Sequence, residues 1–277
     1  MSNLLQRIIT GVLGGALVVG LIFASQWGLA LIVVVLSLVG LWEFYQLSTR
    51  DNIKPNKFLG LFMAILLLFL ILFSDQIDIK PPFWWLVAPL LSLTFISELF
   101  QKSLKPFESI SLTVLGLLYV VLPFIGLYLC SISLGTYQPD IPMGILACLW
   151  ASDSGAYFAG KSFGKHKLFE RISPKKTWEG SVGGLLLSLI TAFVWSCFFK
   201  SMPLQVWLMI SFSIVVMGSL GDLVESMFKR SLEIKDSGSI IPGHGGVLDR
   251  FDGLFMAIPW VLVIIKFYIS YTNLFFD

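Results

Sequence analysis

The chain alternates between long apolar runs and short polar segments along its whole length. Nine of the runs approach the roughly 20 residues that a helix needs to cross a bilayer. The predicted helices span residues 8–25, 28–47, 58–74, 82–99, 110–133, 141–160, 181–199, 204–224 and 253–272. The pattern predicts an all-α, polytopic integral membrane protein with about nine transmembrane helices, which we treat as one integral membrane domain over residues 1–277.

The composition agrees with a chain surrounded by membrane lipids. Hydrophobic residues make up 56% of the sequence and charged residues 13%, whereas a soluble domain carries about 25% charged residues. The net charge of +2 and the lack of interleaved basic and aromatic residues argue against a nucleic-acid partner. The three cysteines, Cys130, Cys148 and Cys197, lie far apart, so their spacing indicates neither a zinc site nor a disulfide framework.

Basic residues fall unevenly between the two sides of the predicted membrane. If the N-terminus is cytoplasmic, sixteen of the nineteen Lys and Arg residues lie on the cytoplasmic side and only Lys80 and Lys200 lie outside. Because positive loops stay in the cytoplasm, we expect the N-terminus to be cytoplasmic and the C-terminus to be outside. Both strongly charged segments of the chain then face the cytoplasm.

Ionisable residues also divide the chain into two halves. Residues 1–140 carry few of them and read as a hydrophobic scaffold half, whereas residues 141–277 include the charged segments and read as a catalytic half. Glu43 and Glu98 are exceptions in the first half. Each lies near a predicted cytoplasmic helix end, and we interpret both as interfacial carboxylates.

The densest charge follows the eighth predicted helix. Asp222, Glu225, Ser226 and Lys229 are spaced i, i+3, i+4 and i+7, so they share one face if the helix continues. Asp222 lies about one turn inside the predicted membrane boundary, where a bare carboxylate is costly. It therefore needs a metal ion, a Lys or Arg side chain, or a proton.

Further acids and a glycine-rich turn precede the ninth predicted helix. Asp249 and Asp252 are spaced i, i+3, and with Asp222 they offer three hard oxygen ligands of the kind that Mg²⁺ prefers. The same acids would also complement a helix dipole without any metal. His244, Gly245 and Gly246 form either a loop whose N–H groups approach an anion or a tight turn with positive φ.

A second charged segment, residues 161–179, follows the sixth predicted helix. Six cations lie between Lys161 and Lys176, among them the adjacent Lys175 and Lys176, and Asp153 lies within the preceding apolar run. The cations are suited to a polyanion such as a nucleoside triphosphate, but they are equally typical of positive residues beside anionic lipid. Neither a P-loop nor a dinucleotide-binding glycine motif is present.

The combined residues resemble those of phosphatidate cytidylyltransferases, also called CDP-diacylglycerol synthases. From Ser226 to Asp252 the chain fills the pattern S-x-x-K-R-x-x-x-x-K-D-x-G-x-x-x-P-x-H-G-G-x-x-D-R-x-D, and S-P-K-K-T-W-E-G at residues 173–180 is also similar to the family. The resemblance implies transfer of a cytidylyl group from CTP to phosphatidic acid, with Mg²⁺ required. A second metal ion and a homodimer are compatible with the sequence and not required by it.

The expected site residues follow from the resemblance and from the charge pattern together. The expected catalytic residues are Asp222, Lys229, Arg230, His244, Asp249, Arg250 and Asp252. The expected substrate-binding residues are Asp153, Lys175, Lys176, Ser226, Lys235, Gly245 and Gly246. The expected metal ligands are Asp222, Asp249 and Asp252.

Other functions remain as alternatives. A CDP-archaeol synthase or a polyprenol-type kinase would share the lipid acceptor and the architecture. An ion-coupled transporter would place discontinuous helices in paired halves, whereas the charge here is confined to one half. A CDP-alcohol phosphotransferase would need D-G-x-x-A-R, but Asp252 and Gly253 are followed by L-F-M-A. We expect location in a bacterial inner membrane, with the site facing the cytoplasm.

Overall fold

The computed structural model describes residues 3–50, 53–74, 84–101, 103–234, 238 and 245–276. Within these residues the chain is almost entirely helical. The helices are α1 (Asn3–Ala24), α2 (Gln26–Ser48), α3 (Lys57–Leu72), α5 (Trp84–Leu99), α6 (Pro106–Gly116), α7 (Leu122–Ser131), α8 (Asp140–Phe163), α9 (Trp178–Phe198), α10 (Leu204–Ser231) and α11 (Leu248–Phe276).

The lengths and the apolar character of these helices indicate a membrane protein. Five helical segments of the described chain are long and apolar enough to cross a membrane: Gln26–Ser48, Pro106–Ser131, Trp178–Phe198, Leu204–Ser231 and Leu248–Leu274. On α9, large apolar side chains such as Val182, Leu186 and Ile190 are exposed at four-residue intervals. Such an exposed apolar stripe is typical of a surface that contacts lipid.

Helices α10 and α11 extend beyond the apolar runs that predict them, at the ends where charged residues lie. The eighth helix ends at Ser231 instead of residue 224, and the ninth begins at Leu248 instead of residue 253. Lys229 and Arg230 occupy the last turn of α10, and Asp249 occupies the first turn of α11. Because these charges complement the helix dipoles, the polar ends continue as helix, and the charged residues project from regular elements.

The fifth predicted helix is continuous but contains an irregular turn. Residues Leu117–Val121 form a π-helical turn, η1, between α6 and α7. Pro123 follows at the start of α7 and has no N–H to donate to the carbonyl of Tyr119, four residues earlier. A π-turn accommodates such a missing hydrogen bond within a helix, which explains why the run is not a uniform α-helix.

The polar segment between α8 and α9 contains a small β-hairpin that the all-helical prediction did not include. Strands β1 (Lys167–Phe169) and β2 (Ser173–Thr177) are antiparallel, with Lys167 opposite Thr177 and Phe169 opposite Ser173. Three- and five-residue strands are too short to give a clear periodic signal in sequence. The hairpin nevertheless decides where Lys175 and Lys176 lie, because both belong to β2.

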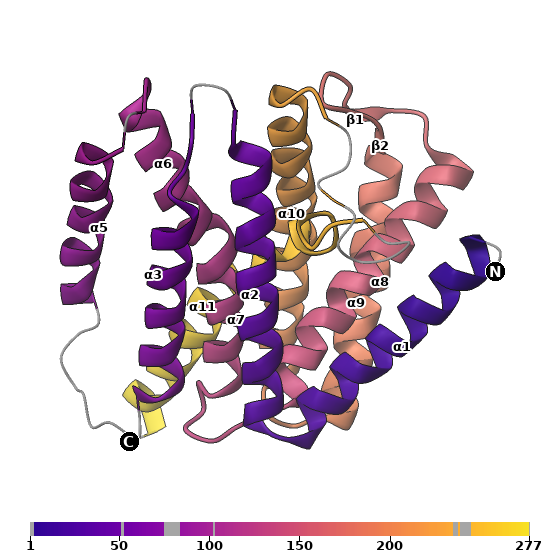
Figure 1. Cartoon of the computed structure of the whole chain (residues 1–277). Helices are drawn as coiled ribbons and strands as arrows, with labels where there is room; N and C mark the ends of the chain where they lie inside the picture. The colour runs from indigo at the N-terminus through magenta and orange to yellow at the C-terminus, as the bar shows by residue number, and fades with distance from the viewer. Residues whose placement is uncertain are drawn as a thin grey trace.

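The two sequence halves share one hydrophobic core. Helices α8 and α9 pack along each other, as do α10 and α11, while α7 contacts α11 and α2 contacts α7 (Figure 1). Phe124 of α7 meets Phe255 of α11 edge to face, with ring centroids 5.5 Å apart. Helices α3, α5 and α6 lie on the opposite side of the molecule from α8 and α9 (Figure 1).

Candidate active site

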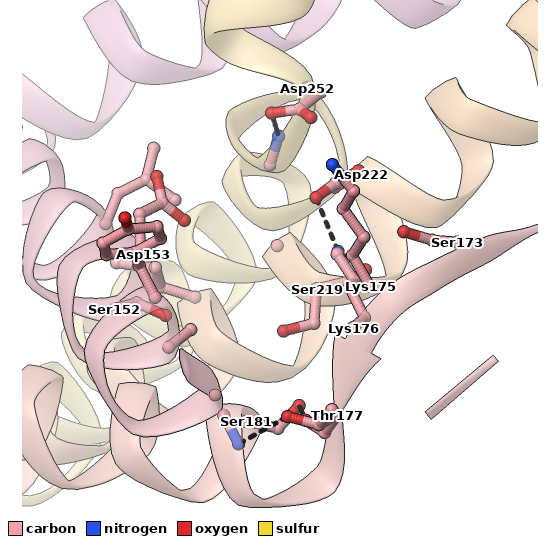
Figure 2. Close-up of a pocket in the computed structure, with 18 of the residues that line it drawn as sticks. Ser152, Asp153, Ser173, Lys175, Lys176, Thr177, Ser181, Ser219, Asp222 and Asp252 are labelled. Carbon is pink, nitrogen blue, oxygen red and sulfur yellow. Dashed lines mark hydrogen bonds and ion pairs between the residues drawn. The ribbon is translucent and has the colours of Figure 1, made fainter. Parts of the chain in front are cut away.

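A cavity of about 540 Å³ lies among α8, α9, α10, α11 and the hairpin strand β2. Its charged lining comes from four elements of the C-terminal half, namely α8, β2, α10 and α11. Figure 2 shows Asp153, Asp222 and Asp252 around the cavity, with Lys175 and Lys176 reaching it from β2. Together with Lys161 of α8, three carboxylates and three lysine ammonium groups therefore line one hollow, and all of them except Lys161 are among the expected site residues.

Close helix packing brings the acids together. A Cβ atom at Gly221 of α10 would lie 2.5 Å from the carbonyl oxygen of Asp252 on α11. Likewise, a Cβ at Gly155 of α8 would lie 2.6 Å from the carbonyl oxygen of Gly183 on α9. Because real side chains do not tolerate such distances, only glycine allows the backbones to approach this closely. The approach of α10 to α11 places Asp222 beside Asp252.

Lys176 is the partner of Asp222 in the described structure. Its Nζ lies 2.7 Å from Asp222 Oδ2 and donates to the carbonyl oxygen of Ser219 at 3.0 Å (Figure 2). Ser226 Oγ donates to the other carboxylate oxygen of Asp222 at 3.2 Å. The predicted shared face of α10 is thus present, and the ion pair joins α10 to the hairpin that carries Lys176.

Glu179 holds the base of the hairpin. Its carboxylate accepts hydrogen bonds from the backbone N–H groups of Lys165 and His166, at 3.1 and 3.2 Å, and lies 2.7 Å from His166 Nδ1. Thr177 caps α9 by accepting from the Gly180 N–H at 3.2 Å, as N-cap residues do. These contacts fix the start and the end of the hairpin against α9 and so position Lys175 and Lys176.

A second polar cluster lies beside the cavity, around Lys229. Lys229 Nζ lies 2.6 Å from Glu225 Oε2 on the same helix and 2.7 Å from Asp249 Oδ1 on α11. The side chain of Glu225 is 2% exposed, and those of Lys229 and Asp249 are each 14% exposed. Asp249 Oδ2 also accepts from the Gly246 N–H at 3.3 Å. The cluster therefore joins the end of α10 to the start of α11.

The predicted metal ligands are divided between the cavity and the cluster around Lys229. Asp222 and Asp252 line the cavity, whereas Asp249 belongs to the Lys229 cluster. Among the described residues, no three His, Cys, Asp or Glu side chains are grouped closely enough to hold a metal ion. Mg²⁺ typically takes only one or two protein carboxylates and completes its shell with water and substrate oxygens. Of the three predicted ligands, Asp222 and Asp252 therefore fit such an ion, because their carboxylate oxygens line the cavity.

Glu43 is a functional candidate that the sequence interpretation missed. It is 2% exposed, and its Oε2 accepts from the backbone N–H of Val247 at 2.7 Å. A Cβ at Gly238 would lie 2.8 Å from the other carboxylate oxygen of Glu43. The interpretation of Glu43 and Glu98 as interfacial carboxylates is wrong, because both are buried. A carboxylate within a long apolar run was the available signal, but its partner in the loop before α11 could not be read from sequence.

The remaining predicted residues lie near the same end of α10 and α11. Arg230 is exposed and donates to the carbonyl oxygen of Ile234 at 3.2 Å, and Arg250 is exposed in the first turn of α11. Gly245 has φ of +86°, a conformation that favours glycine, in agreement with the predicted tight turn. Lys235 and His244 lie outside the described residues, so their roles stay predictions.

Several residues that line the cavity are not among the expected site residues. Tyr157 and Lys161 of α8 line the cavity, and residues with hydroxyl groups line it beside the charged residues. These hydroxyl residues are Ser152, Ser173, Thr177, Ser181 and Ser219 (Figure 2). Individual serines carry no recognisable spacing signal, and only the folded arrangement shows that they line one hollow.

The chain is similar to known proteins over nearly its whole length. The family model described as the cytidylyltransferase family matches residues 5–268. A phosphatidate cytidylyltransferase of Bacillus subtilis is 33% identical over 276 residues, which cover 97% of this chain and 100% of the relative. A phosphatidate cytidylyltransferase of Haemophilus influenzae is 33% identical over 282 residues, 92% of this chain and 96% of the relative. One of Staphylococcus haemolyticus is 33% identical over 270 residues, 94% and 98% of the two chains.

Proposed function

Because this chain belongs to the cytidylyltransferase family, we propose that it transfers the cytidylyl group of CTP to phosphatidic acid, forming CDP-diacylglycerol and pyrophosphate. Relatives named phosphatidate cytidylyltransferase match it over nearly its full length. The observation that carries the proposal is the cavity in which Asp153, Asp222 and Asp252 meet Lys175 and Lys176 among membrane helices. Such a site is accessible to a charged nucleotide and lies close to lipid.

The reaction joins two anions. An oxygen of the phosphatidate phosphate attacks the α-phosphorus of CTP, and the bond from that phosphorus to the oxygen bridging to the β-phosphate breaks. Its electron pair leaves with pyrophosphate. Because the attacking phosphate is already anionic, the protein needs to position the reactants and neutralise charge more than to remove a proton. Lys175 and Lys176 are placed for that neutralisation, since both line the cavity.

We propose Mg²⁺ as the cofactor. The described cavity holds three carboxylates against three lysines, so the protein offers no net positive charge to a triphosphate unless a further cation takes part. Mg²⁺ would neutralise phosphate oxygens and stabilise the leaving pyrophosphate. Asp222 and Asp252 are the proposed ligands in the cavity. Asp249 is retained as a proposed ligand from the sequence pattern, although its carboxylate contacts Lys229 in this structure.

The other cations take two kinds of role in this proposal. Lys229 contacts two buried carboxylates, so its charge serves mainly to hold α10 and α11 together. Arg230 and Arg250 are exposed at the same end of these helices and are suited to bind phosphate, because guanidinium groups bind phosphates in bidentate fashion. Lys235 and His244 belong to the same proposed site on sequence grounds.

We also propose that nine helical segments cross a bacterial inner membrane, with the N-terminus and the cavity on the cytoplasmic side. Besides the five long apolar segments, the described chain contains three shorter apolar helices at Gly11–Ala24, Lys57–Leu72 and Ala88–Leu99. Helix α8 is the ninth, and its lower hydropathy follows from the polar residues that it contributes to the cavity. The uneven distribution of Lys and Arg supports the orientation.

The proposal is tested with purified protein in lipid vesicles that contain phosphatidic acid. With CTP labelled at the α-phosphate and Mg²⁺, the label is expected in the lipid product, and with CTP labelled at the γ-phosphate it is expected in pyrophosphate. Chelation of the metal should stop both. Folded protein that labels archaeal-type or polyprenol lipids instead of phosphatidic acid, or labels no lipid, would contradict the assignment.

A further inference from the structure

A second hollow shares α8 and α11 with the active-site cavity. It is a groove of about 550 Å³ formed by α1, α2, α8 and α11. Its described walls are apolar, with Leu31 on α2 and Trp150 on α8 among the lining side chains. Arg250, at the start of α11, is the one charged residue among the described residues that line the groove. The groove therefore combines a long apolar surface with a cation, Arg250, at the start of α11.

The groove and the active-site cavity share two walls. On α8, Trp150 lines the groove and Asp153, less than one turn further on, lines the cavity. On α11, Arg250 and Phe251 line the groove, and the next residue, Asp252, lines the cavity. A ligand with its head near the start of α11 would thus be within reach of both hollows.

Glycines make the α1 wall of the groove shallow. Gly14 and Gly15 line the groove, and a Cβ atom built at either residue would have no atom within 4 Å. The lining residues of α1 extend from Gly11 to Leu21, which corresponds to about 15 Å along a helix axis. The groove is therefore extended along the helix and open at the glycines, a shape suited to a flexible hydrocarbon chain.

We propose that this groove binds an acyl chain of the phosphatidic acid acceptor, with Arg250 contacting the phosphate group. The inference rests on the proposed function and adds to it the place of the lipid. Charge complementarity selects the occupant, because one guanidinium beside an apolar surface matches one phosphate attached to hydrocarbon. The shared walls then direct that phosphate towards Asp252 and the lysines of the cavity.

The test compares acceptors of different chain length in detergent micelles. Gly14→Leu and Gly15→Leu place side chains in the groove, and Leu31→Trp fills it from the opposite wall. Gly20→Leu is the matched control, because Gly20 also lies on α1 with open space around its Cβ but does not line the groove. Leucine favours helix over glycine, so none of the glycine changes is expected to disrupt α1.

The groove variants should raise KM for dioleoyl phosphatidic acid roughly tenfold, because a leucine displaces about two methylene groups and each contributes about a factor of four to binding. KM for dihexanoyl phosphatidic acid and for CTP should stay unchanged, since short chains do not extend along the groove. Gly20→Leu should behave like the unsubstituted protein with both acceptors.

Three results would overturn the inference. Unchanged KM for dioleoyl phosphatidic acid in all three groove variants would show that the acyl chain does not bind there. Equal losses with both acceptors, in variants whose circular dichroism matches that of the unsubstituted protein, would show that the groove does not contact the long acyl chain. A changed oligomeric mass without a chain-length effect would assign the groove to contact between protein copies. Failure of the proposed function is distinguishable, because the unsubstituted protein would then be inactive even on the dihexanoyl acceptor.

Discussion

At the residue scale, Lys229 balances most of the buried charge at the end of α10. It contacts Glu225 and Asp249, both within 2.7 Å, and all three side chains are mostly buried. A buried ion pair is not strongly stabilising in itself, because desolvation offsets much of the attraction. Removing one member is costly, however, since the remaining charge has no partner.

We therefore predict that Lys229→Ala destabilises the protein by about 3 kcal/mol. Adding Glu225→Gln should restore part of the loss, because it removes one of the two uncompensated carboxylates. Unfolding in detergent, followed by circular dichroism for both single variants and the double variant, measures the coupling. Strictly additive effects of the two substitutions would show that Lys229 and Glu225 do not interact as described.

The sequence indicates which residues line the cavity better than it indicates which side chains those residues contact. Charge beside lipid and spacing along α10 indicate Asp222 as a site residue. Its pairing with Lys176 depends on a short hairpin, and its closeness to Asp252 depends on backbone contact at Gly221. Both are tertiary contacts between distant segments, and no local pattern in the chain encodes them. For the same reason, the sequence groups Asp249 with Asp222 and Asp252, although in the folded chain Asp249 contacts Lys229.

At the element scale, the hairpin and the end of α2 position the site from outside the bundle of α8 to α11. The hairpin is attached to α9 through Glu179, whose carboxylate accepts from Lys165 and His166. Helix α2 reaches the loop before α11 through Glu43. The stacking of Phe44 on Phe228, with ring centroids 5.1 Å apart, also joins α2 to α10.

Loosening the hairpin should weaken nucleotide binding. We predict that Glu179→Ala raises KM for CTP several-fold, because Lys175 and Lys176 lose their fixed position while the lipid acceptor is unaffected. Glu170→Ala, which removes an exposed carboxylate in the hairpin turn, is the control and should leave KM for CTP unchanged. Steady-state kinetics with each substrate varied in turn distinguishes the two. A loss confined to the lipid acceptor would contradict this role of the hairpin.

The hydrogen bond from the Val247 N–H to Glu43 predicts a loss of activity that a glutamine at position 43 should largely restore. Glu43→Ala should lower kcat/KM by at least about tenfold, because a buried backbone N–H loses a charged acceptor. Glu43→Gln keeps an acceptor oxygen and should restore most of the activity. Glu98→Ala is a matched control, since Glu98 is also buried but lies on α5, away from the cavity (Figure 1). Equal losses in the Ala and Gln variants would exclude the hydrogen-bonding role.

The lengths of the apolar runs located the helical elements, but they placed several helix ends too early or too late. Run length reports where lipid contact is possible, whereas a helix continues as long as its polar ends are stabilised. This difference explains why α10 extends to Ser231 and α11 begins at Leu248. The hairpin has no comparable apolar signal, and its pairing is visible only in the folded chain.

At the scale of the whole molecule, the division into a scaffold half and a catalytic half is incomplete. One hydrophobic cluster includes Tyr45 and Phe124 from the first half together with Trp207 and Phe255 from the second. The first half also contributes Glu43 to the site loop and two walls of the groove. The fold is thus one packed unit whose charged end carries the proposed chemistry.

The proposed orientation predicts which loops can be labelled from outside. In a Cys197→Ser background, Thr136→Cys lies in the exposed connection between α7 and α8, and Glu170→Cys lies in the hairpin turn. A membrane-impermeant maleimide should label position 136 in intact cells and position 170 only after the membrane is opened. Cys130 and Cys148 are buried and should not react. The reverse labelling pattern would show that the chain crosses the membrane in the opposite orientation.

The central claim is that the cavity between α8 and α11 transfers the cytidylyl group, and Asp222 tests it most directly. Asp222→Asn keeps the shape of the side chain but removes the charge that contacts Lys176 and is proposed to bind Mg²⁺. Transfer of α-labelled phosphate from CTP to phosphatidic acid should fall at least about a hundredfold, of the order found when one electrostatic group is removed from an active site. Glu108→Gln, an exposed change on α6, should retain full activity. Near-normal transfer by folded Asp222→Asn protein would contradict the claim.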